Sequence, residues 1–119
     1  TLVPLVTGDT NDEATAAALS ACPCDDETLW VISSDLSHFL DGSTARMIDE
    51  ETAEAIENDD IDTLTPRRAC GARAIRGLLK TRGAMNLGPA TRHDLRHSGD
   101  TAGNPDRVVG YGAWTLRPT

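Results

Sequence analysis

Asp35 and His38 are the residues of this chain best placed to do chemistry. They follow Trp30 to Ile32, an aromatic and β-branched run that predicts a buried strand. In open α/β sheets, ligands bind just outside the carboxyl ends of the strands, so Asp35 and His38 are expected at such a site. An imidazole can bind a metal ion or transfer a proton, which makes His38 a candidate metal ligand and catalytic residue.

Cys70 is the second candidate metal ligand. It lies in Ala69-Cys70-Gly71, at the start of a predicted helix. A thiolate suits copper(I) and zinc, whereas an imidazole also suits iron. His38 and Cys70 alone cannot form a closed structural zinc site, because that site needs four ligands. Cys70 could equally be a small buried thiol, since free cysteines are among the most buried residues.

Asp35 has several roles open to it. It could bind the metal, orient His38 by accepting a hydrogen bond, act as a general base, or cap the turn that follows the strand. A hydrolase triad of Asp35, Ser37 and His38 is disfavoured, because neighbours in one turn rarely align as a triad. The chain also lacks a Gly-x-Ser-x-Gly motif.

Two other groups of metal-capable residues are not expected to bind metal. His93 and His97 have the i, i+4 spacing that chelates only on a helix, and their segment reads as extended. We therefore expect surface or partly buried histidines. Cys22 and Cys24 have one residue between them, whereas zinc and redox motifs use two. This pair reads as a helix end that enters a loop.

The composition excludes some functions. The 119 residues carry a net charge of −8, which disfavours binding to nucleic acid or to anionic membranes. We see no signal peptide or membrane span, and three cysteines are an odd number, so we expect a cytoplasmic protein with reduced thiols. Ten arginines accompany one lysine among many acids, which fits a halophilic cytoplasm or, equally, a GC-rich bacterial genome.

The hydrophobic pattern predicts alternating strands and helices. A strand over 2–6, a helix over 11–21 and a strand over 29–34 suggest a βαβ unit with parallel strands. Amphipathic helices are predicted from Ser43 or Thr44 to Glu57 and over 71–81. An edge strand is expected around 94–97, and a final strand over 107–116.

These elements predict an α/β fold with a small mixed sheet flanked by helices. The acidic side chains of the helix ending at Glu57, Asp49 among them, are expected on its solvent face. Three predicted strands and one weaker strand would form only a small sheet, which three helices would cover thinly. The chain is therefore expected to be part of a larger domain.

Several motifs of the chain resemble those of the Memo family, which includes AmmeMemoRadiSam system protein B. They occur in the family's order: Leu2-Val3-Pro4-Leu5-Val6-Thr7-Gly8, Ser33-Ser34-Asp35-Leu36-Ser37-His38-Phe39, Ala45-Arg46-Met47-Ile48-Asp49, Ala69-Cys70-Gly71, Ser98-Gly99-Asp100 and Arg107-Val108-Val109-Gly110-Tyr111. The resemblance covers essentially the whole chain. It implies that residues 1–119 are one Memo-like domain that corresponds to the family's C-terminal half.

The resemblance also implies a fold like that of class III extradiol dioxygenases and a pocket for iron or copper. His38 and Cys70 match family metal ligands, and Asp35 matches an acid of the pocket. The family's upstream histidines have no counterpart here, so the implied ligand set is incomplete. The implied partners are the radical enzyme and companion components of the AmmeMemoRadiSam system.

We therefore expect a metal-dependent oxidoreductase, in which the thiol favours metal-redox work over dioxygenase-like ring cleavage. The alternative is a non-catalytic module whose cleft binds a peptide or a protein. A third reading is a remnant without function, which would expose apolar surface.

Overall fold

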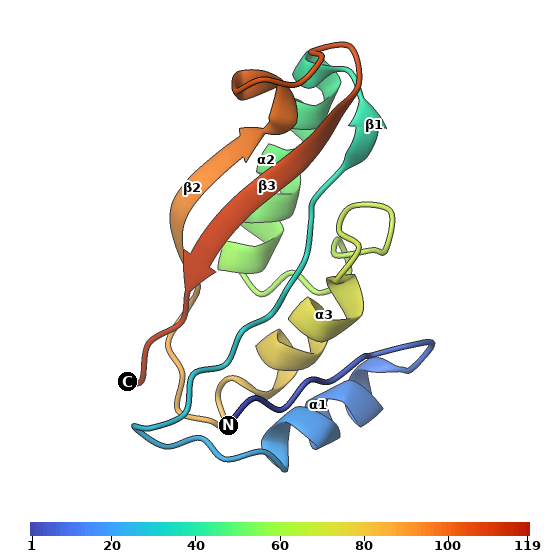
Figure 1. The fold of residues 1–119 in the computed structure, drawn as a ribbon. Coiled ribbons are helices and arrows are strands. Elements are labelled where there is room, and N and C mark those ends of the chain that lie inside the picture. The colour runs from blue at the N-terminus through green and yellow to red at the C-terminus, as the bar shows by residue number, and fades with distance from the viewer.

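The computed structural model describes all residues from 1 to 119 as three α-helices, one short 3-10 helix and three β-strands. In chain order they are α1 (Asp12–Ser20), β1 (His38–Leu40), α2 (Gly42–Glu57), α3 (Ala72–Thr81), β2 (Thr91–His97), η1 (Ser98–Asp100) and β3 (Val108–Thr115). Figure 1 shows α2 against the sheet, and α1 beside α3 beyond one end of it. The predicted α/β class is confirmed.

The sheet has the order β1-β3-β2, and both pairings are antiparallel. β3 is the central strand, with His38 opposite Val109 on one side and His97 opposite Gly110 on the other. The predicted edge strand and final strand are confirmed as β2 and β3. The short strand β1, which begins at His38, was not predicted.

The predicted parallel βαβ unit is wrong. Residues 2–6 and 29–34 are in no strand, and the side chains of Leu2, Val6 and Leu29 are exposed. Their apolar composition favours strands, but β-propensity mainly measures how a side chain packs against neighbouring strands. These segments have no neighbouring strand, so the local preference forms no hydrogen-bonded ladder.

The helices α1 and α2 each have a side-chain N-cap. Asn11 accepts a hydrogen bond from the N–H of Ala14, and Asp41 accepts one from the N–H of Thr44. The N-cap of the second helix is thus Asp41, two residues before the predicted cap Ser43, and its carboxylate also accepts hydrogen bonds from the hydroxyls of Ser43 and Thr44. No helix of the structure combines the length and apolar character needed to cross a membrane.

The core consists of two neighbouring apolar clusters. The larger joins α2 and α3 through buried residues such as Ile56 and Leu79. The smaller consists of Leu36, Ala69 and Ala72. Trp114 of β3 packs against both clusters, so the central strand links the helices to the segments around residues 36 and 69.

Candidate metal site

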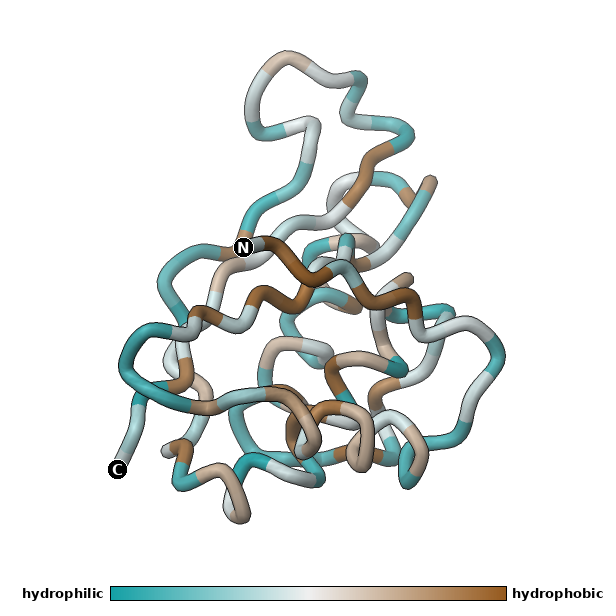
Figure 2. Tube along the Cα trace, turned by 60° about the horizontal axis from the view of Figure 1, so that its bottom comes forward, coloured by the Kyte–Doolittle hydropathy of each residue, from teal (hydrophilic) through white to brown (hydrophobic).

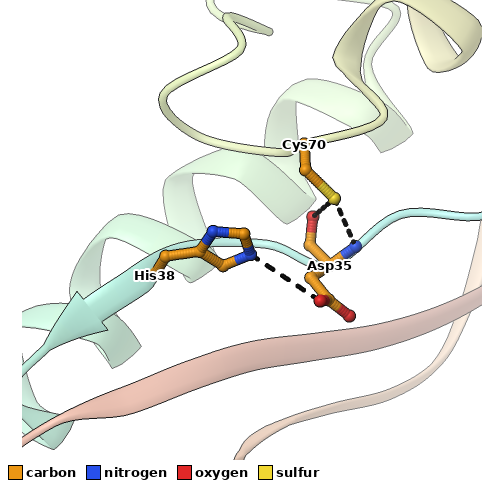
Figure 3. Close-up of side chains that lie close together, drawn as sticks. All are labelled: Asp35, His38 and Cys70. Carbon is orange, nitrogen blue, oxygen red and sulfur yellow. Dashed lines mark hydrogen bonds and ion pairs between the residues drawn. The ribbon is translucent and has the colours of Figure 1, made fainter.

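Asp35, His38 and Cys70 lie together, although 35 residues separate the first from the last. One donor atom of each, the Asp35 carboxylate, a His38 ring nitrogen and the Cys70 sulfur, lies within 4.8 Å of the other two. Figure 3 shows Asp35 next to both other residues, with His38 to its left and Cys70 above it. His38 and Cys70 are exposed and Asp35 is partly buried, so the group is open to solvent.

The segment that carries Asp35 and His38 is fixed to the centre of the sheet. The N–H of Leu36 donates to the carbonyl of Gly110, and the N–H of Gly110 donates to the carbonyl of Ser37, both at 2.8 Å. The side chain of Leu36 is buried in the smaller core cluster. Since alternate side chains of an extended chain point to opposite sides, burial of Leu36 leaves Asp35 outside the core.

Cys70 is held against the same segment by its neighbours. The N–H of Cys70 donates to the carbonyl of Asp35 at 3.2 Å, and the N–H of Asp35 donates to the Cys70 sulfur at 3.1 Å. Gly71 is in close contact with the same segment, since a Cβ at this position would lie 2.5 Å from the carbonyl oxygen of Ser33. Only glycine permits this approach, which explains the Cys-Gly pair.

Asp49 of α2 also positions the site, and its predicted place on the solvent face is wrong. Asp49 is 2% exposed, and its carboxylate accepts a hydrogen bond from the N–H of Ser37 at 2.9 Å. Asp49 was predicted on the outer face because it is an acid, although its spacing from Ala45 and Thr52 places it on the buried face of the helix. Its place in the motif Ala45–Asp49 was the signal that could have identified it.

The surroundings of His38 are charged and aromatic. Its Nε2 lies 3.7 Å from the Asp35 carboxylate, so a protonated His38 would form an ion pair with Asp35. The ring of Phe39 lies beside that of His38 with 5.6 Å between centroids, and the guanidinium of Arg107 stacks on Phe39 at 4.4 Å. Phe39 has a φ of 63°, a conformation that costs a bulky residue energy and that clusters at functional sites.

The other metal-capable residues lie outside this group. His93 is exposed and contacts Thr115, whereas His97 is buried beside Arg46 and Asp100. Full burial of His97 differs from the predicted surface or partly buried position. Cys22 and Cys24 are free thiols after the end of α1, as predicted.

The hydroxyl of Ser37 is buried and has no hydrogen-bond partner. It therefore makes no hydrogen bond with the imidazole of His38. A hydrolase triad of Asp35, Ser37 and His38 requires that hydrogen bond, which the structure does not contain.

The known proteins that match this chain all carry the name of one family. A MEMO1 family protein of Methanosarcina mazei is 36% identical over 89 residues, which are 70% of this chain and 33% of that protein. MEMO1 family proteins of Methanosarcina acetivorans and Methanosarcina barkeri are each 34% identical, over 70% and 71% of this chain and 33% and 34% of their own lengths. No family model and no solved structure matches the chain.

The chain thus spans about one third of the length of the curated relatives that it matches. The motifs that carried the family resemblance also contact one another in space. Asp49 binds the backbone of Ser37, and Arg46 pairs with Asp100. With this sequence match and these contacts, the chain belongs to the MEMO1 family.

Proposed function

We propose that Asp35, His38 and Cys70 bind a redox-active metal ion, iron or copper, and that the chain serves a metal-dependent redox function. The observation that carries the proposal is the convergence of three different donor atoms within 4.8 Å, from two distant segments. Exposed acids often lie together without a metal. A histidine and a cysteine that join an acid are a more specific combination.

The donor set fits the proposed ion. Nitrogen and sulfur donors suit copper(I), and nitrogen with a carboxylate oxygen suits iron(II). The two segments are already fixed to each other by the hydrogen bonds between Asp35 and Cys70, so binding would require little rearrangement. Three donors on an open surface would also leave metal positions free for an exogenous ligand.

Asp35 is the most adaptable member of the group. Its carboxylate can bind the metal, or it can accept a hydrogen bond from a His38 ring whose other nitrogen faces the metal. It can also hold a proton next to a bound ligand. The metal would supply electron transfer or oxygen binding, and the soft thiolate favours electron transfer over dioxygenase-like ring cleavage.

The wider assignments follow from family membership. A radical enzyme and companion components of the AmmeMemoRadiSam system are the partners that the resemblance implies. Three free cysteines fit a reducing compartment, which supports a cytoplasmic location.

The test is an anaerobic titration of the chain with iron(II) or copper(I), with the binding measured by isothermal titration calorimetry. We expect one metal per chain, with affinity reduced at least about tenfold in His38→Ala and Cys70→Ser. Matched controls are His93→Ala and Cys24→Ser, which remove the same side-chain types away from the group. Both controls should bind as the parent does.

Two results would contradict the proposal. One is the absence of stoichiometric binding of either ion. The other is an equal loss in the control variants, since that would indicate nonspecific binding to exposed imidazoles and thiols. If the chain binds metal as expected, oxygen consumption by the loaded protein would distinguish a dioxygenase-like activity from electron transfer.

A further inference from the structure

Arg107 carries a positive charge that no acid of this chain neutralises. Eight of the eleven lysines and arginines form ion pairs in a chain with 19 acids, and Arg107 is not one of the eight. Its guanidinium makes no hydrogen bond either, and it lies over the ring of Phe39. Figure 2 shows hydrophilic residues, in teal, all around the molecule rather than on one side. The free guanidinium is therefore a feature of this place and not of a generally basic surface.

The side chain of Arg107 is nevertheless held in place. Its guanidinium carbon lies 4.4 Å from the centroid of the Phe39 ring, a contact that orients the guanidinium and leaves its N–H groups free. The backbone is fixed as well, because Arg107 directly precedes Val108, which is fully buried and pairs with Leu40. A cation that is already oriented loses little freedom when it binds an anion.

The backbone at Phe39 presents the ring on which Arg107 lies. His38 is opposite Val109 and Leu40 is opposite Val108, so Phe39 is the extra residue of a β-bulge in β1. Bulges redirect a side chain and are common next to active sites. Phe39 also has a φ of 63° and is 62% exposed, so burial of its ring does not account for this conformation. The contact with Arg107 gives the exposed ring a purpose.

The free cation lies close to the candidate metal ligands. The centroid of the Phe39 ring is 5.6 Å from that of the His38 ring. Together with the stacking distance, this places the guanidinium carbon of Arg107 within about 10 Å of the His38 ring. A small molecule of that length can reach a metal ion at His38 with one end and Arg107 with the other, which would orient it for reaction.

The charges around the site favour a carboxylate as the anion. The fork of one guanidinium matches the two oxygens of one carboxylate. A phosphate monoester carries a charge of about −2 at neutral pH. The Asp35 carboxylate beside His38 and the net charge of −8 would repel that group more strongly than a singly charged one.

We propose, on the basis of the metal site proposed above, that Arg107 binds the carboxylate of a small-molecule substrate whose other end meets the metal. Arg107 is then a residue that determines substrate specificity, and Phe39 is the positioning residue that holds it. The substrate class is a small carboxylic acid with a second group that can bind a metal ion.

The experiment uses the chain loaded with iron(II) or copper(I) and two probes, 4-ethylimidazole and 3-(imidazol-4-yl)propionate. Both probes can bind the metal through the imidazole ring, and only the second carries a carboxylate. Anaerobic calorimetry gives the ratio of their affinities within each variant, so a change in metal loading affects both probes alike. We expect the carboxylate probe to bind the parent chain at least about tenfold more tightly.

Variants assign this preference to the two residues. In Arg107→Gln the ratio should fall to about one, because the charge and the fork are lost. In Phe39→Leu the ratio should fall in part, and Phe39→Tyr should restore it, because tyrosine keeps the aromatic ring. Arg117→Gln is the matched control, since it removes an exposed arginine beyond the opposite end of β3. Its ratio should equal that of the parent.

Equal affinities of the two probes for the parent chain would overturn the role of Arg107, as would failure of both probes to bind the metal-loaded chain. A preference that persists in Arg107→Gln would overturn it too, since the carboxylate would then be bound elsewhere. Failure of the proposed metal site has a different signature, because neither iron(II) nor copper(I) would bind before any probe is added.

Discussion

The buried carboxylate of Asp49 accepts a 2.9 Å hydrogen bond from the backbone N–H of Ser37. This contact connects α2 to the segment that carries Asp35 and His38. The carboxylate also fills the space beside Gly110, whose backbone pairs with residues 36 and 37. One acidic side chain thus joins the helix, the central strand and the candidate site.

Replacement of Asp49 should therefore affect both stability and metal binding. Asp49→Ala would leave the N–H of Ser37 buried without a partner, which costs about 1–3 kcal/mol in the free energy of unfolding. Metal affinity should fall as well, because the segment with Asp35 and His38 would be less well fixed. Urea unfolding and metal titration would measure the two effects.

Asp49→Asn is the informative companion variant. It keeps an amide oxygen that can accept from Ser37, so it should retain more stability and more metal affinity than Asp49→Ala. Equal losses in the two variants would show that the charge of Asp49, rather than its hydrogen bond, supports the site.

Gly110 should not tolerate a side chain. A Cβ at this position would lie 1.9 Å from a carboxylate oxygen of Asp49, so Gly110→Ala must displace Asp49 or the central strand. We expect a loss of about 1–3 kcal/mol in thermal or urea unfolding. Gly83→Ala, where a Cβ would have no neighbour within 4 Å, is the control and should cost nothing comparable. A Gly110→Ala protein as stable as the parent would contradict this packing.

Gly71 should matter more for the site than for the fold. In Gly71→Ala, the new methyl group would push against the carbonyl of Ser33 and move Cys70 away from Asp35. We expect metal affinity to fall about tenfold or more, because ligand geometry is disturbed while all three donor types remain. Calorimetric titration would measure this loss. Unchanged affinity, together with the loss in Cys70→Ser, would show that the close contact at residue 71 does not position the thiol.

Acid should destabilise the fold through its ion pairs. A hydrogen bond from Arg76 lowers the pKa of Asp12, and one from Arg92 lowers the pKa of Glu57. The ordinary pKa values are near 3.8 and 4.5, so these pairs stabilise the fold fully above that range. Their contribution is lost as the pH falls through the lowered folded-state values, because the unfolded chain binds protons first.

We therefore expect the free energy of unfolding to be level near neutral pH and to fall below about pH 5. In Asp12→Asn, the free energy of unfolding at pH 7 should drop by only about 1 kcal/mol, because the ion pair with Arg76 is partly exposed. The free energy of unfolding should also fall less steeply between pH 5 and pH 3 than it does in the parent. Asp26→Asn, at an exposed acid outside the ion pairs, is the control. Urea midpoints across pH 3–7 would supply the comparison, and a parallel pH profile of Asp12→Asn and parent would contradict it.

The helices could be predicted from the sequence because their signals are local. The periodicity placed Ala45, Ile56, Leu78 and Leu79 on buried faces, and the structure confirms each of them. The candidate donors could be named from the sequence, and the structure brings their donor atoms within 4.8 Å of one another. Residue type and the family motifs around Asp35, His38 and Cys70 identified the candidate donors, whereas the run before Asp35, which was predicted to be a strand, is in no strand.

The sequence by itself thus determined the α/β class, the helices and the three candidate donors, since residue type, caps and periodicity act over a few neighbours. Tertiary structure decided what depends on distant partners. It brought Cys70 to Asp35, buried Asp49 beneath Ser37, and formed β1 where no strand was expected. It also left 2–6 and 29–34 unpaired, because a strand exists only where another segment supplies its hydrogen bonds.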